Sequence, residues 1–137
     1  MANEPSFDLQ AHMRRLHMQP GPLATPADLS RIEHLAGFAL PAPYRTFLTT
    51  AGGARCNCIL TQGPSADRDV IFFAPDQILS RLEDLSGQGL VPIADDLMGD
   101  VYYLARDGVK QFVDADQDFV DVAPSFEALL EQMEIRQ

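Results

Sequence analysis

The chain has no long hydrophobic run. No stretch of its 137 residues approaches the roughly 20 consecutive apolar positions that a membrane-spanning helix requires. Its first segment, MANEPSFDLQAHMRR, has no apolar core behind a positive start, which a secretory signal would need. We therefore expect a cytoplasmic protein without a membrane partner.

Cysteine and histidine are scarce as well. Cys56 and Cys58 lie one residue apart, and on a strand this spacing places both side chains on one face about 7 Å apart, which is poor for a mutual disulfide. A zinc site would need two further ligands, and His12, His17 and His34 show no paired-ligand spacing. We expect structural or incidental cysteines, no metal and no cofactor.

Positive charge is limited too. The chain has 10 Lys and Arg residues, with Lys110 its one lysine, against 20 Asp and Glu residues, and it has no Trp. The net charge is −10 and the pI about 4.5. A field of this sign repels phosphate backbones, so nucleic-acid binding has no support.

The negative charge that is present is unevenly distributed. Residues 91–137 hold 11 acidic and 3 basic residues, a net charge of −8, so residues 1–90 carry only −2 of the total of −10. An acidic surface favours a cationic partner, mainly by accelerating encounter. The charge could equally serve solubility alone, and composition leaves both interpretations open.

Hydrophobic spacing and turn residues divide the chain into helices and strands. Thr25 as N-cap, Pro26, and Gly37 as the terminating residue mark the clearest helix. Asp107-Gly108 is a strong hairpin signal. We expect helices over 7–17, 25–37, 41–53, 75–85 and from 125 onward, and strands over 55–60, 69–74, 89–94, 100–105, 109–113 and 118–123.

This order predicts the fold class: an α+β single domain, with a mainly antiparallel sheet and helices packed on one face. Residues 1–24 are expected to form an N-terminal helix and a Pro/Gly linker, and residues 25–137 the α+β domain.

The stretch 114–122, DADQDFVDV, tests whether the acidic residues hold a metal. Asp114, Asp116 and Asp118 match positions 1, 3 and 5 of an EF-hand loop. Position 6 is Phe119 where the loop needs Gly, and position 12 is Ser125 where it needs a bidentate Glu. We expect a turn feeding the last strand, with Phe119 and residues 120–122 anchoring it and the three Asp side chains in water.

Catalytic motifs are missing from the sequence. It has no Gly-x-Ser-x-Gly elbow, no phosphate loop and no dinucleotide fingerprint. Asp95 and Asp96 could act as an acid/base pair only if burial separated their pKa values, and adjacent Asp residues in a turn are usually solvated. We expect a protein that is not an enzyme.

One long region resembles a known family. The segment 25–53, TPADLSRIEHLAGFALPAPYRTFLTTAGG, resembles the signature region of the SUKH superfamily, which includes bacterial toxin-immunity proteins and a fungal regulator of cell-wall synthesis. The segments PIADDLMGDVYYLARDG and APSFEALLEQM are similar to its downstream elements, so the resemblance covers about residues 25–135. The residues that we assign to the structural signature are Gly37, Leu40, Pro41, Tyr44, Phe47, Gly52 and Gly53.

The resemblance implies binding and not catalysis. Immunity proteins of this kind neutralise a cognate toxin by occluding it, and many such toxins are nucleases, which are cationic near their phosphate site. The expected partner is thus a cationic protein, and the alternative is a regulatory or scaffolding module of the same fold. The candidate partner-binding residues are acidic: Asp95, Asp96, Asp100, Asp114, Asp116, Asp118 and Asp121.

Overall fold

The structure is a computed structural model that describes residues 8–63, 65–85, 87–113 and 116–136. Its described residues form five helices: α1 (Leu9–Arg15), α2 (Pro26–Ala36), α3 (Ala42–Thr50), α4 (Pro75–Leu82) and α5 (Phe126–Glu131). They also form seven strands: β1 (Cys58–Leu60), β2 (Ile71–Phe72), β3 (Val91–Asp95), β4 (Val101–Ala105), β5 (Gly108–Val113), β6 (Asp118–Ala123) and β7 (Met133–Ile135). Every helix and strand expected from the sequence is present, most of them shorter than predicted.

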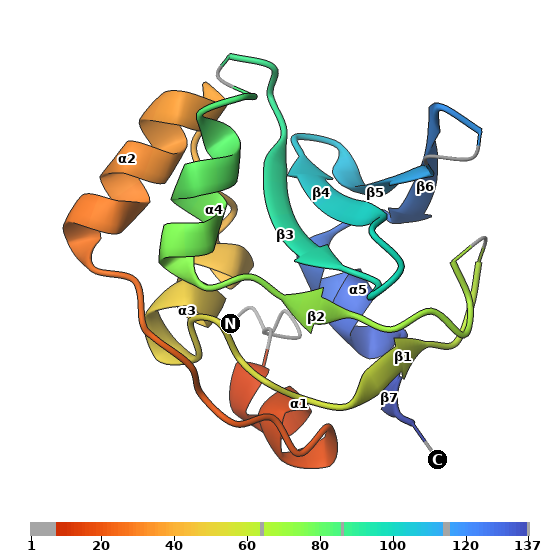
Figure 1. The fold of residues 1–137 in the computed structure, drawn as a ribbon. Coiled ribbons are helices and arrows are strands. Elements are labelled where there is room, and N and C mark those ends of the chain that lie inside the picture. The colour runs from red at the N-terminus through yellow and green to blue at the C-terminus, as the bar shows by residue number, and fades with distance from the viewer. Residues whose placement is uncertain (1–7, 64, 86, 114–115, 137) are drawn as a thin grey trace, which may run out of the picture.

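The main sheet has five antiparallel strands in the order β2-β3-β4-β5-β6. A second sheet pairs β1 with β7 and lies at the lower right of Figure 1. The sequence analysis did not predict β7. The fold is α+β with an antiparallel sheet in a single domain, as expected.

Helices cover the inner face of the main sheet. α5 contacts β5 and β6 and lies behind the strands in Figure 1, while α4 contacts β3 and packs against α2. Four aromatic rings meet in the centre of the core, where the Tyr44 and Phe126 centroids are 4.9 Å apart and those of Phe47 and Phe72 are 4.8 Å apart. The core therefore joins α3, α5 and β2, which are distant in the sequence.

The start and end of α2 follow from local chemistry. Thr25 Oγ1 accepts a hydrogen bond from the Asp28 amide, and the Asp28 carboxylate accepts one from the Thr25 amide, which is a complete capping box. Gly37 ends the helix with φ of 87°, in the left-handed region that glycine adopts without strain.

The N-terminal segment belongs to the same core. Leu9, Met13 and Leu16 are buried, and the Arg15 guanidinium donates hydrogen bonds to the carbonyls of Leu130 (2.5 Å) and Met133 (2.7 Å). α1 is thereby attached to the C-terminal end of the chain. Over the described residues, no helix has the length and apolar character needed to cross a bilayer.

Candidate functional site

Both acidic turns lie at the same end of the main sheet. β3, β4, β5 and β6 follow one another as antiparallel hairpins, so successive turns alternate between the two ends. The β3–β4 turn and the β5–β6 turn therefore share one end, on the right of the sheet in Figure 1, and the Asp107-Gly108 turn lies at the other. The fold thus brings the two acidic segments of the sequence together.

Asp96 organises the first of these turns from below the surface. Its side chain is 0% exposed. Oδ1 accepts hydrogen bonds from the amides of Met98 (2.9 Å) and Asp100 (3.1 Å). Oδ2 accepts from Arg68 Nη1 at 2.5 Å and from Gln111 Nε2 at 3.1 Å. The expectation that Asp96 offers its carboxylate to a partner is wrong, because both oxygens are used inside the protein.

The network around Asp96 reaches two further segments. Arg68 Nη1 also lies 3.0 Å from Asp100 Oδ2, and the two carboxylates raise the pKa of Arg68 by accepting its hydrogen bonds. Gln111 Oε1 accepts a hydrogen bond from Ser65 Oγ at 2.6 Å, and both side chains are buried. Hydrogen bonds and ion pairs to β5 and to the 65–68 turn consequently hold the acidic turn in place.

The remaining candidate acids are placed closer to solvent. Asp95 is partly exposed and accepts a hydrogen bond from the Leu97 amide, while Asp100 is partly exposed beside Arg68. Asp116, in the turn before β6, and Asp118, the first residue of β6, are exposed. Asp114 lies outside the described residues.

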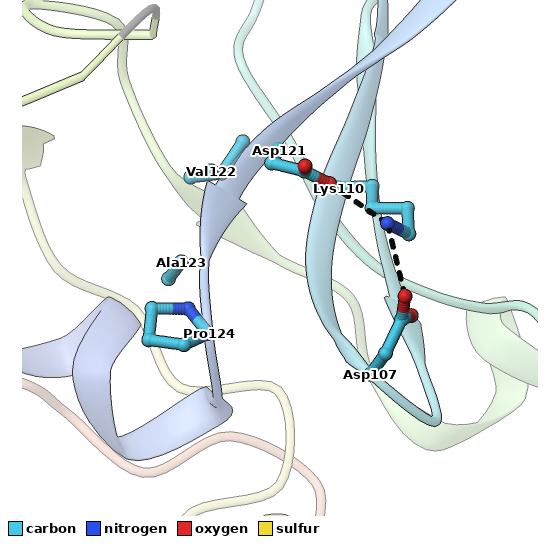
Figure 2. Close-up of a pocket in the computed structure, with 6 residues that line it drawn as sticks. All are labelled: Asp107, Lys110, Asp121, Val122, Ala123 and Pro124. Atoms are coloured by element: carbon cyan, nitrogen blue, oxygen red, sulfur yellow. Dashed lines mark hydrogen bonds and ion pairs between the residues drawn. The ribbon is translucent and has the colours of Figure 1, made fainter.

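Asp121 is paired with the single lysine of the chain. Lys110 Nζ lies 2.7 Å from Asp121 Oδ1 and 3.5 Å from Asp107 Oδ2, beside a cavity of about 360 Å³ (Figure 2). The hydrogen bond to Asp121 raises the pKa of Lys110. One cation faces two carboxylates here, as Arg68 does at the other cluster, so each group of three keeps a net negative charge.

The outer face of the sheet carries apolar side chains that sequence reasoning missed. Met98 is 83% exposed, Leu97 66% and Phe119 41%. The Phe119 ring lies 5.1 Å from that of Phe112 and 6.0 Å from that of Tyr103, both half-buried. We expected Phe119 and residues 120–122 to anchor the last strand; Phe119 packs on the outer face against Phe112 and Tyr103, and the buried residue of this segment is Val122.

A signal for this outer face was present in the sequence. Side chains alternate between the two faces along a strand, and in β4 and β5 the buried residues include Tyr102, Leu104, Val109 and Gln111, while Ala105 and Gly108 are buried beside the turn between the two strands. Tyr103 and Phe112 occupy the alternate positions, and Phe112 pairs with Phe119 in register. Assigning alternate residues of β4, β5 and β6 to opposite faces would have placed the side chains of Tyr103, Phe112 and Phe119 on the outer face.

The geometry gives little support to a metal site or to a nucleophilic cysteine. Among the described residues, no three or more His, Cys, Asp or Glu side chains gather as a metal site would require. The cysteines are free thiols. The hydrogen bond between them, together with burial, raises the pKa of Cys56, whereas the same hydrogen bond lowers the pKa of Cys58, which is fully buried in the core and out of reach of a substrate. A raised pKa disfavours the thiolate that nucleophilic catalysis needs.

The signature residues occupy structural positions. Leu40, Tyr44 and Phe47 are buried in the core, and Gly37 caps α2. A comparison with protein families matches residues 23–132 of the chain to the SMI1 / KNR4 family (SUKH-1). The chain belongs to this family. No curated protein matches the chain.

The SUKH-1 match covers both acidic turns and the whole main sheet. It leaves out α1 and β7, at the two ends of the chain. These two elements contact each other through Arg15, which donates to the Met133 carbonyl. This contact forms a clasp between the N-terminal and C-terminal segments of the chain.

Proposed function

We propose that this SUKH-1 chain is a non-catalytic protein-binding domain, an immunity-type inhibitor that occludes a cognate cationic toxin such as a nuclease through its acidic face. SUKH-1 membership supports an immunity-type or regulatory domain. The observation that carries the finer proposal is the placement of both acidic turns at one end of the sheet. A toxin that binds phosphate is cationic near its active site, and an acidic surface accelerates encounter with it.

The acidic face in this proposal consists of Asp95, Asp100, Asp116 and Asp118 at this end of the sheet, with Asp121 farther along β6, where it pairs with Lys110 near the Asp107 turn. Asp96 positions the first turn and makes no contact with the partner. The fixed geometry of that turn favours binding, because a rigid surface loses little conformational freedom when the partner docks.

The experiment is a co-expression test in cells. The chain is produced together with the toxin candidate encoded beside its gene, and growth is compared with cells that make the toxin alone. We expect protection and a complex that survives purification. A variant carrying Asp116→Asn and Asp118→Asn should associate more slowly, by several-fold at low salt, since rim charges act mainly on the association rate.

A matched control changes the same charge elsewhere. Glu83 and Asp84 are exposed residues that follow α4, so Glu83→Gln with Asp84→Asn removes two negative charges outside the acidic face. This control should leave association nearly unchanged. Absence of protection by the wild-type chain, together with absence of a complex, would favour the regulatory or scaffolding alternative.

A further inference from the structure

The outer face of β4, β5 and β6 combines exposure with apolar character. Tyr103, Phe112 and Phe119 form a ring cluster on this face, and Met98 projects from the adjacent turn at 83% exposure. Exposed aromatic and methionine side chains that lie together are unusual on a monomeric protein and mark binding surfaces. The inner face of the same strands is fully occupied by the core.

A hollow lies next to this ring cluster. A cavity of about 220 Å³ is lined by Met98, Gly99, Asp100, Val101, Tyr103 and Phe112. Its lining includes two aromatic residues, a methionine and Asp100, whose partly exposed carboxylate also pairs with Arg68. Such a site accommodates a long side chain that is apolar along its stem and positively charged at its tip, because the stem packs on the rings while the tip meets the carboxylate.

The charges around the outer face determine which kind of molecule can bind there. Asp95 and Asp100 lie at the β3–β4 turn and Asp116 and Asp118 at the β5–β6 turn, so all four stand at one end of this face. Arg68 is shared between Asp100 and the buried Asp96, so this group of three keeps one negative charge. Asp95 also lines a hollow with Arg55 and Arg81, so Asp100, Asp116 and Asp118 supply most of the negative charge of the rim. A second copy of this chain, with its net charge of −10, or an anionic lipid surface would be repelled here. A basic protein surface is attracted.

We infer that the outer sheet face, formed by Met98, Tyr103, Phe112 and Phe119, is the docking surface for a basic partner protein, which inserts an arginine beside Met98 and covers the rings with apolar side chains. This inference rests on the proposed function and deepens it, because it assigns most of the binding free energy to the aromatic rings and Met98 and not to the acidic residues. The carboxylates then steer the encounter, and the aromatic and methionine contacts determine how long the complex lasts.

The test uses a defined probe, a twelve-residue peptide in which arginine and leucine alternate. It is titrated into isotope-labelled full-length chain while amide resonances are followed by NMR. We expect the largest shifts at Met98, Tyr103, Phe112 and Phe119. A peptide with glutamate in place of arginine, and one with serine in place of leucine, should each bind at least about tenfold more weakly, a difference of about 1.4 kcal/mol.

Substitutions of exposed residues complete the test, because they should change the folding stability little. Met98→Ser and Phe119→Ser should each weaken peptide binding several-fold. The control, Leu23→Ser, alters a residue that is 52% exposed on the loop before α2, and it should have no effect. Shifts that map to another face, equal binding by the arginine–serine peptide, or no binding at millimolar peptide would each overturn the inference.

Failure of the inference can be separated from failure of the proposed function. A wild-type chain that protects cells from the toxin, and protects them equally well as Met98→Ser and Phe119→Ser, would retain the function and refute this docking surface. A chain that binds the arginine–leucine peptide on the outer face but protects no cell would support the surface and refute the immunity role.

Discussion

Arg68 Nη1 lies 2.5 Å from Asp96 Oδ2, and this contact joins a partly exposed guanidinium to a carboxylate whose side chain is fully buried. The buried partner is the one that controls local structure, because its other oxygen holds the amides of Met98 and Asp100. The shape of the acidic turn therefore depends on a residue whose side chain is not exposed at the surface.

Replacement of Asp96 should destabilise the protein although it lies in a surface turn. Asp96→Asn removes the charge that Arg68 meets and puts an amide group where one of two accepting oxygens stood. Breaking a buried ion pair costs about 3–5 kcal/mol, and since Arg68 stays partly hydrated and keeps Asp100, we expect about 2–3 kcal/mol. Urea unfolding measures this loss.

Asp95→Asn is the matched control for that measurement. Asp95 is partly exposed, and its Oδ1 accepts a hydrogen bond from the Leu97 amide that an asparagine oxygen can also accept. The expected change is below about 1 kcal/mol. Equal losses from the two neighbouring substitutions would contradict the network described for Asp96.

Gly53 is required because the backbone of Ala74 lies too close for a side chain, and Gly87 because its backbone is in the left-handed region. Substitution by alanine should therefore lower the stability by different amounts at the two positions. A Cβ on Gly53 would stand 2.7 Å from the Ala74 Cα, which is backbone and cannot rotate away. At Gly87 a Cβ would meet nothing within 4 Å, but φ is 79°. We expect Gly53→Ala to cost more than about 2 kcal/mol and Gly87→Ala about 1 kcal/mol, measured by thermal or urea unfolding. Similar losses would show that the approach of Gly53 to Ala74 relaxes easily.

Glu33 should make the stability depend on pH in the acid range. Burial raises the pKa of Glu33, but hydrogen bonds from the Leu40 amide (2.7 Å) and Arg45 (2.6 Å) outweigh it and leave the pKa below its ordinary value. The folded pKa is thus lower than the unfolded one, so the stabilisation is present above the unfolded pKa of about 4.3 and is lost as pH falls through the folded value.

The corresponding measurement compares wild type with Glu33→Gln by urea unfolding between neutral pH and about pH 3. The gap in unfolding free energy should be widest near neutral pH and narrow steadily below about pH 4.3. In an Arg45→Met background the same substitution should cost less, because one of the two hydrogen bonds is already gone. A gap that stays constant with pH would refute the role of the Glu33 charge.

The sequence predicted local structure well where the residues that determine an element lie within the element itself. Thr25 and Asp28 lie within one turn, and Gly37 ends the same helix, so the limits of α2 could be predicted without knowledge of the rest of the chain. The fold class followed from the order of such segments. β7 was missed because its three residues become a strand only by pairing with Cys58–Leu60, more than seventy positions earlier in the chain.

The candidate site was harder to predict for the same reason. Asp95 and Asp96 are neighbours of identical chemistry, and only Arg68 and Gln111, brought in from two other segments, decide which of them is buried. The clustering of acids at one end of the sheet could have been predicted by counting hairpins, whereas the outward direction of Phe119 depends on the register between β5 and β6. Register is set by the whole sheet, and no short segment specifies it.

Loss of the clasp between the two ends of the chain should loosen α1 and β7 and leave the main sheet intact. Arg15→Met keeps the length of the side chain but removes both hydrogen bonds to the carbonyls of Leu130 and Met133. Hydrogen bonds from a charged donor contribute about 1.5–3 kcal/mol, and since Arg15 is exposed we expect the lower end of that range. Hydrogen exchange followed by mass spectrometry should show faster exchange in α1 and β7 than in the main sheet. Arg14→Met, at an exposed neighbouring position, should leave the exchange unchanged, and an equal effect of both substitutions would mean that helix propensity, and not the clasp, holds α1 in place.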